Sequence, residues 1–174
     1  MTAVARAAEL AVGTLYQLFP SKEAILRSLL EERMEALIEQ VAAAVAEEAD
    51  VPAQLARIVR THLTFAAENA DVLRLYLSGW IGYDVAVRRR FGDRIDAKYE
   101  QYLGLLATVL ARGTQDGSLA PRPARRLAVT LAGMVHAVIR RWLRERSLDL
   151  QAEGDALLDL FLHGAAAASE RRRR

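Results

Sequence analysis

Residues 13–23 read Gly-Thr-Leu-Tyr-Gln-Leu-Phe-Pro-Ser-Lys-Glu, from Gly13 to Glu23. Pro20 ends one helical pattern, because proline lacks the N–H that a continuing helix needs. Ser21 is a good N-cap for the next helix, and Glu23 favours the positive end of that helix's dipole. We therefore predict a short helix over Val12–Leu18, a tight corner, and a long helix that starts at Ser21.

A second short pattern precedes this corner, over about Ala3–Glu9. Two short helices joined by a tight turn form a helix-turn-helix, whose second helix enters the major groove of DNA. Glycine allows a close approach to the DNA backbone, hydroxyls can bond phosphates or base edges, and a helix N-terminus favours phosphate. The candidate DNA contacts are Val12, Gly13, Thr14, Tyr16, Gln17 and Lys22. The alternative is a plain helix corner with no DNA contact.

The rest of the chain predicts helices only, because no stretch alternates apolar and polar residues with the β-branched content of a strand. Each of the four prolines stands at a plausible helix boundary. We place a loop between Gly113 and Gly117. Asp50 can cap the helix that follows it, as Ser21 does. The expected helices are Ser21–Ala49, Asp50–Asn69, Asp71–Ile81, Tyr83–Arg112, Pro123–Arg146 and Leu150–Ala168.

The composition bounds the class of protein. The chain has 174 residues, 52% of them hydrophobic and 26% charged, which is usual for a globular protein with a core. It has no cysteine, so disulfides and thiolate metal sites are excluded. No apolar run approaches the roughly 18 residues of a membrane span, and the N-terminus has no signal-peptide pattern. These features predict a cytoplasmic protein with no membrane partner.

The segment Val4–Ala24 resembles the TetR family of bacterial repressors, most specifically in Gly13–Tyr16 and Phe19–Glu23. The later residues Asp116–Leu119 and Leu160–Gly164 are also similar to that family. The resemblance implies an all-α homodimer that binds operator DNA and is released by a small effector, which changes the spacing of the two DNA-binding heads. It divides the chain into a partial helix-turn-helix domain with its connecting helix (1–48), a ligand-binding and dimerisation domain (49–170) and a basic tail (171–174).

The chain departs from the family pattern in its first residues. Family members carry a helix ahead of this point, so we expect the first helix of the DNA-binding domain to be missing. Glycine is usual where Glu9 stands, and Ser or Thr where Ala11 stands. If the position of Glu9 takes a positive φ, a side chain there costs on the order of 1 kcal/mol.

Aromatic residues gather in the middle of the chain, which is where a lipophilic pocket between helices would need them. Buried tyrosines also bring a hydroxyl that requires a partner. The alternative is an ordinary apolar core, and the run Arg88–Arg90 is either a contact for an anionic ligand or a solvated face. The candidate effector contacts are Phe65, Tyr76, Trp80, Tyr83, Tyr99 and Tyr102.

The last two long helices carry apolar stripes that suit a four-helix interface between two chains with twofold symmetry. An intrachain core is the alternative. The candidate dimer contacts are Ala128, Ala132, Val135, Ile139, Leu157, Phe161 and Gly164.

Nothing in the sequence predicts catalysis, a metal or a cofactor. His62, His136 and His163 are expected to lie far apart, and no Glu-x-x-His pair occurs. The main prediction is a TetR-like repressor that binds DNA as a homodimer and is released by a small lipophilic effector. The alternative is a helical dimer that binds a ligand or protein and no longer binds DNA. It is favoured by Glu9 and by the 9 acidic against 4 basic side chains of residues 1–50.

Overall fold

The computed structural model describes residues 1–46, 50–77 and 93–164. These residues form helices and contain no strand, so the all-α prediction is confirmed. The helices are α1 (Thr2–Ala7), α2 (Val12–Leu18), α3 (Lys22–Ala46), α4 (Val51–Glu68), α5 (Ala70–Leu77), α7 (Asp93–Gln115), α8 (Ala124–Arg144) and α9 (Leu150–His163).

Side-chain caps fix the starts of three helices. The Ser21 hydroxyl accepts a hydrogen bond from the Ala24 N–H at 3.1 Å, and the Asp50 carboxylate accepts one from the Ala53 N–H at 3.0 Å. Both caps confirm the sequence prediction, because each satisfies an N–H that has no partner within the first turn. Asp149 caps α9 in the same way.

Two predicted boundaries were wrong. The first helix ends at Ala7 rather than Glu9, because Glu9 has a φ of 55° and leaves the helical conformation. Gly113 does not open a loop but lies inside α7, where a Cβ would come within 2.7 Å of Leu119 and 2.8 Å of Val51. Its lack of a side chain therefore allows a close contact inside the helix. The predicted helix parts at 47–49, 78–81, 83–92 and 165–168 lie outside the described residues.

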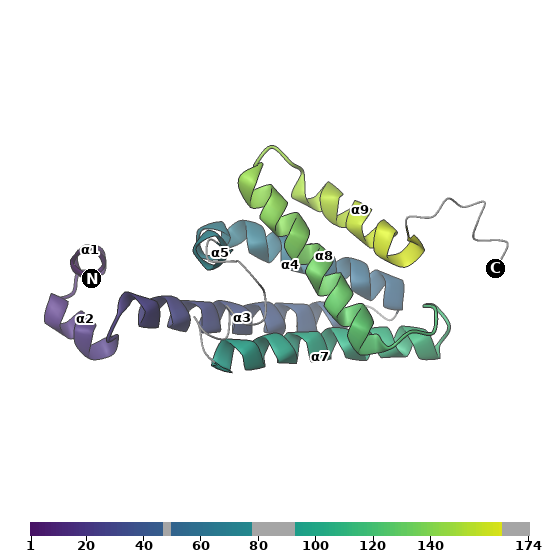
Figure 1. Cartoon of the computed structure of the whole chain (residues 1–174), viewed down its shortest axis with the longest axis horizontal. Coiled ribbons are helices and arrows are strands. Elements are labelled where there is room, and N and C mark those ends of the chain that lie inside the picture. The colour runs from purple at the N-terminus through teal and green to yellow at the C-terminus, as the bar shows by residue number, and fades with distance from the viewer. Residues whose placement is uncertain (47–49, 78–92, 165–174) are drawn as a thin grey trace.

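The helices form a bundle from which one end of α3 projects (Figure 1). The short helices α1 and α2 lie at that projecting end and form the head of the molecule. Helix α7 runs beside α3 in the same direction, and α4 returns along α3 in the opposite direction. Helices α8 and α9 complete the bundle, α8 against α7 and α9 against α4.

Two separate groups of buried side chains hold α3 in place. The main core includes Leu37 and Val41 of α3 together with residues of α4, α7, α8 and α9. A small second cluster surrounds Leu30 and Ile95, with Leu26 and Val72 packed against them. The second cluster lies nearer the head, so α3 crosses from one core to the other between Leu30 and Leu37.

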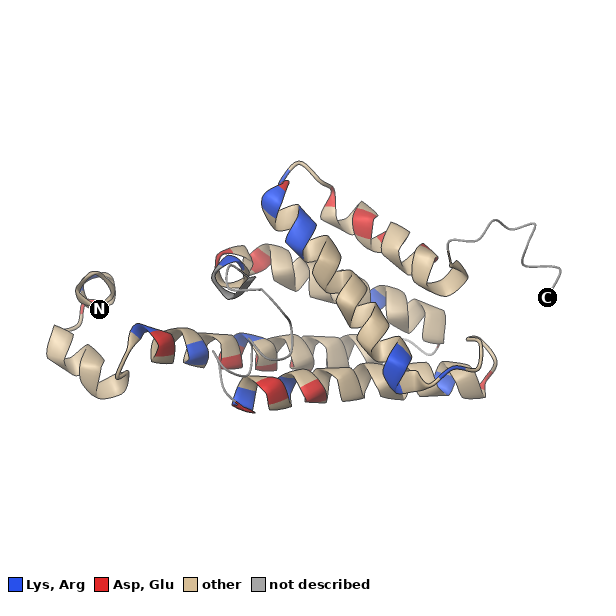
Figure 2. Cartoon of the chain, viewed as in Figure 1, with Lys and Arg blue, Asp and Glu red and all other residues tan. Residues whose placement is uncertain are grey.

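Ion pairs join α3 to α7 along the same stretch. Glu31 of α3 pairs with Arg94 at 3.4 Å, and Glu35, one turn later, pairs with Lys98 at 3.0 Å. Figure 2 shows that both helices carry acidic and basic residues where they run side by side. Each pair has one largely exposed member, so the contribution of the pairs to the packing of α3 on α7 is modest.

Candidate functional site

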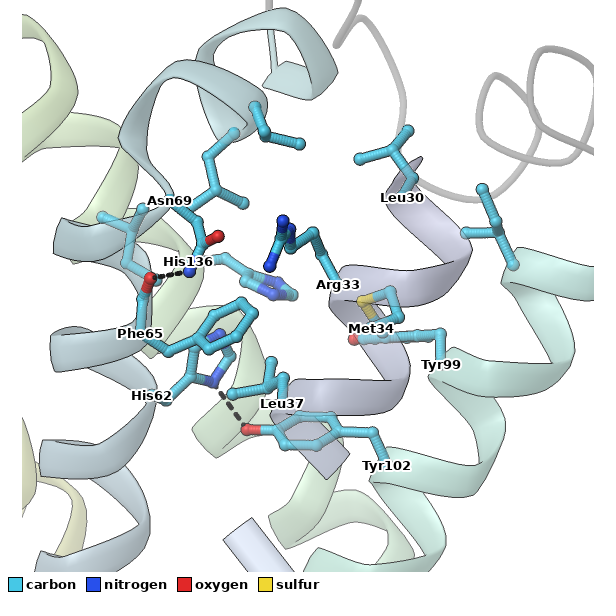
Figure 3. Close-up of a pocket in the computed structure, with 14 residues that line it drawn as sticks. Leu30, Arg33, Met34, Leu37, His62, Phe65, Asn69, Tyr99, Tyr102 and His136 are labelled. Carbon is cyan, nitrogen blue, oxygen red and sulfur yellow. Dashed lines mark hydrogen bonds between the residues drawn. The ribbon is translucent and has the colours of Figure 1, made fainter. Parts of the chain in front are cut away.

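A pocket lies where α3 passes between the two cores, enclosed by α3, α4, α5, α7 and α8 (Figure 3). Its mouth and the open solvent there included, it contains about 780 Å³ of space not filled by atoms. Its wall is mostly apolar, and none of its described lining residues is acidic. The lining residues are Leu30, Arg33, Met34, Leu37, His62, Phe65, Asn69, Val72, Leu73, Ile95, Tyr99, Tyr102, His136 and Ile139.

Four rings form a polar cluster at one end of this pocket. The Tyr102 hydroxyl lies 2.9 Å from Nδ1 of His62, and both side chains are buried. The His62 ring meets the His136 ring edge to face at 5.7 Å between centroids, and His136 stacks on Tyr99 at 6.0 Å. The cluster supplies hydrogen-bonding groups at the end of an otherwise apolar cavity.

The histidines of this cluster are held neutral. Burial lowers the pKa of His62 to about 3, with a further contribution from the neighbouring His136. Burial also lowers the pKa of His136 to about 4, and the nearby positive charge of Arg140 acts in the same direction. Burial raises the pKa of Tyr102, so its hydroxyl stays protonated within hydrogen-bond distance of His62. The cluster therefore carries no charge near neutral pH.

Arg33 brings the one permanent positive charge among the described lining residues. Its guanidinium reaches from α3 into the pocket, opposite Asn69 and His136 (Figure 3). The Asn69 amide nitrogen donates to the Phe65 carbonyl oxygen at 2.9 Å, which orients the amide beside the cavity.

The pocket contains part of the predicted effector site. Phe65, Tyr99 and Tyr102 line it together. Trp80, Tyr83 and the run Arg88–Arg90 lie outside the described residues, as does the side chain of Tyr76.

The sequence analysis missed the pocket's histidines and Arg33. The expectation that His62 and His136 lie far apart was wrong, because α4 and α8 bring their rings into contact. A usable signal existed on α4, where His62, Phe65 and Asn69 follow one another at steps of three and four residues and so share one face.

The head presents all six predicted DNA contacts on its surface. Val12, Gly13, Thr14, Tyr16, Gln17 and Lys22 are exposed. Leu15, only 3% exposed, anchors α2, as Ala5 anchors α1. Glu9 adopts the positive φ that the sequence analysis considered, so the turn between α1 and α2 carries the cost of a side chain in that conformation.

The predicted dimer contacts are mostly covered within a single chain. Ala128, Ala132, Val135, Ile139 and Leu157 are buried in the chain's own core, and Phe161 is partly buried against it, whereas Gly164 is exposed. Side chains packed in the chain's own core have little surface left for contact with a second chain. An apolar stripe shows that a helix face is buried but not which element covers it.

The outer side of α8 and α9 carries a different apolar groove. It is lined by Met134, Ala137, Val138, Glu153, Ala156, Leu157 and Leu160. Leu160, which lines the groove, is 46% exposed. A surface of this kind is suited to contact with another protein.

Among residues 1–46, 50–77 and 93–164, no three histidine or acidic side chains are grouped so that they could hold a metal ion. In the same ranges, no helix has the length and apolar character required to span a membrane.

Known proteins match the chain over both head and bundle. Residues 48–165 match the family model for the tetracyclin repressor-like C-terminal domain, and residues 1–29 match that for bacterial regulatory proteins of the tetR family. The fatty acid metabolism regulator protein of Bacillus subtilis (strain 168) is 26% identical over 163 residues, which is 92% of this chain and 82% of that protein.

Solved structures give the same fold. The transcriptional regulator FadR from Bacillus subtilis, in complex with stearoyl-CoA, has a TM-score of 0.82 and 24% identity, over 95% of this chain and 88% of that one. The fatty acid degradation regulator FadR from Bacillus halodurans has a TM-score of 0.79 and 25% identity, over 94% and 87%.

Proposed function

The chain belongs to the TetR family of bacterial transcriptional regulators, and on that premise we propose that it is a cytoplasmic repressor released by a long-chain acyl effector. In this proposal the chain binds operator DNA as a homodimer through α2 and the start of α3. The observation that carries the proposal is the apolar pocket against α3, the helix that leads directly to the head.

The nature of the effector follows from the wall of the pocket and from the relatives. Apolar side chains such as Leu30, Phe65 and Ile139 favour a hydrocarbon chain, since its burial stabilises the complex by roughly 0.8 kcal/mol per CH₂ group. The similar FadR structure from Bacillus subtilis is a complex with stearoyl-CoA. We therefore propose a fatty acyl group, as the free acid or the coenzyme A thioester, as the effector.

Release from DNA would follow from a shift between two arrangements of α3. Leu30, Arg33, Met34 and Leu37 of α3 all line the pocket, so a ligand there contacts the helix that carries the head. A ligand that binds one inclination of α3 better than another favours that inclination by its difference in affinity. Two heads must meet half-sites about 34 Å apart, so a change in their spacing weakens DNA binding.

The second copy would dock on the outer groove of α8 and α9. Exposed Leu160 becomes buried in such a contact, and twofold symmetry brings the same groove of each chain together. Leu157, one of the predicted dimer contacts, also lines this groove.

The test begins with selection of genomic DNA fragments bound by the purified chain. Fluorescence anisotropy of a selected fragment is then recorded at several salt concentrations, with stearoyl-CoA and with free coenzyme A as the control for its head group. We expect an affinity that falls steeply with salt, and release by stearoyl-CoA alone. Tyr16→Phe and Lys22→Gln should weaken binding, whereas Arg60→Met on α4 should not.

Absence of specific DNA binding together with tight acyl binding would instead favour a ligand-binding dimer that does not bind DNA. The position of Glu9, a carboxylate in the turn before α2, is the observation that favours this second function.

A further inference from the structure

Arg33 is the one described residue with a buried side-chain nitrogen or oxygen that lacks a hydrogen-bond partner. The atom concerned is Nε, on the part of the side chain that enters the pocket. The outer part of the guanidinium lies 3.8 Å from the Glu32 carboxylate, and the two side chains are 40% and 68% exposed. An exposed pair at that distance contributes little and leaves Nε without an acceptor.

A buried N–H without an acceptor is unfavourable, because it has lost its hydrogen bond to water without forming one to the protein. Arginine makes the loss larger, because all of its N–H groups are donors and its charge persists at every physiological pH. No acidic side chain is found among the described residues that line the pocket, and the two histidines beside it are neutral. The protein therefore presents a cationic donor to an apolar cavity without an internal counterion there.

We propose that Arg33 binds the carbonyl oxygen at the head of the effector and thereby selects acyl ligands over other hydrocarbon chains. The inference rests on the proposed function, because it takes an acyl ligand as the occupant of the pocket. Nε–H donates to the carbonyl oxygen, and the apolar wall formed by residues such as Leu30, Val72 and Ile95 contacts the hydrocarbon chain. A free carboxylate and a thioester both present an oxygen that can accept this hydrogen bond.

Asn69 lies on the opposite side of the proposed head position. Its amide nitrogen is held by the Phe65 carbonyl oxygen, and Figure 3 shows its oxygen pointing toward the side of the pocket that Arg33 enters. Arg33 faces this position with a buried N–H that no acceptor of the protein meets. Arg33 is therefore a specificity-determining residue rather than a part of the protein's core.

The test compares three ligands of equal chain length: dodecanoic acid, dodecanoyl-CoA and 1-dodecanol, which has no carbonyl group. Binding to the full chain is measured by isothermal titration calorimetry for wild type, Arg33→Met, Arg33→Lys and Arg60→Met. Arg60 is an exposed arginine on α4 outside the pocket and serves as the matched control. Far-UV circular dichroism and thermal unfolding check that each variant is folded.

We expect Arg33→Met to weaken binding of at least one of the two carbonyl ligands by about 10- to 100-fold, the worth of a hydrogen bond from a charged donor. Binding of 1-dodecanol should change by less than about threefold, and Arg60→Met should behave as wild type. Arg33→Lys should recover part of the loss, because it keeps the charge but lacks the planar Nε donor. Loss of dodecanoic acid alone identifies a carboxylate head, and loss of dodecanoyl-CoA alone identifies a thioester.

Two results would overturn the inference, and they differ from one another. If wild type binds the carbonyl ligands and Arg33→Met binds them equally well, Arg33 does not hold the head, while the proposed function stands. If wild type binds none of the three ligands, the acyl effector itself is wrong. The stability of ligand-free Arg33→Met gives an independent readout. It should match or exceed that of wild type, because the substitution removes an unsatisfied buried donor.

Discussion

Acidification from pH 8 to pH 5 should lower the free energy of unfolding by about 4 kcal/mol through His62 and His136 alone. Their pKa values in the folded protein are lowered from 6.5 to about 3 and about 4. At pH 5 each imidazole is protonated in the unfolded chain but neutral in the folded one. pH 5 lies 1.5 units below the unfolded pKa of 6.5, so each histidine lowers the free energy of unfolding by about 2 kcal/mol at that pH.

The direction follows from proton binding. Because both folded pKa values lie below that of the unfolded chain, the unfolded chain binds more protons between about pH 3 and 6.5. The contribution to stability is therefore complete above about pH 7 and is lost as the pH falls through this window.

A double substitution isolates the contribution of His62. His62→Phe together with Tyr102→Phe replaces both partners of the buried hydrogen bond by rings of similar shape, which avoids an unsatisfied hydroxyl. Urea unfolding followed by circular dichroism at pH 8, 7, 6 and 5 gives the free energy of each protein. The loss between pH 8 and pH 5 should be about 2 kcal/mol smaller in the double variant, since only His136 then titrates in the cluster.

The control is His163→Gln, on an exposed histidine at the end of α9. Its pH dependence should match wild type within about 0.5 kcal/mol, because an exposed pair such as His163 with Asp159 contributes little. Carboxylates that titrate in the same range are common to all three proteins and cancel in the comparison. If the double variant lost as much stability as wild type, the assignment of the acid sensitivity to the buried cluster would be refuted.

Three further substitutions test the head, the core and the link between them. Glu9→Gly should stabilise the turn at φ 55° by up to about 1 kcal/mol. It should also raise DNA affinity beyond that of the control Glu9→Gln, which removes only the charge. Equal affinities of the two variants in the anisotropy assay would contradict a role for the turn. Gly154→Ala should lower the free energy of unfolding in urea by about 1–3 kcal/mol, because its Cβ would lie 2.4 Å from the buried Leu63 side chain. The control Gly104→Ala meets nothing within 4 Å and should raise that free energy by up to about 1 kcal/mol. An unchanged stability of Gly154→Ala would show that the core around Leu63 adjusts to the added methyl group. Leu30→Ala removes a contact of the small cluster. The DNA affinity without stearoyl-CoA, divided by the affinity with it, should then be smaller than in wild type. An unchanged ratio would mean that the small cluster does not couple the pocket to the head.

Features fixed by neighbouring residues were predictable from the sequence. The helix Val12–Leu18 was predicted with its observed bounds, and the caps at Ser21 and Asp50 were predicted with their observed role. Each depends on hydrogen bonds that span three or four residues, so the residue types alone suffice. The positive φ of Glu9 belongs to the same class, since the tight turn requires it.

Features fixed by packing between distant helices were not predictable in the same way. The bond between His62 and Tyr102 spans 40 residues, and neither residue is unusual in its own helix. The stripe on α8 was correctly identified as buried, but the partner that buries it is the chain's own core rather than a second copy. Only the arrangement of the bundle decides which of two apolar faces of α8 turns inward.

The position of the pocket explains why an effector could act on the head at all. Helix α3 is held by the main core at Leu37 and by the small cluster at Leu30, and the pocket opens between these two attachments. A ligand in the pocket would contact α3 between these two attachments and change how α3 packs on each of them. From Met34 to the start of α3 at Lys22 the helix extends about 18 Å, at 1.5 Å per residue. A tilt of about 5° about Met34 would then displace each head by roughly 1.6 Å, or about 3 Å for the pair, against a half-site separation of about 34 Å. Since base contacts depend on hydrogen bonds that fail within a few tenths of an ångström, a small rotation at the pocket is enough to disrupt binding. The ion pairs of Glu31 and Glu35 with α7 lie along this stretch of α3, so a tilt of the helix would also displace them.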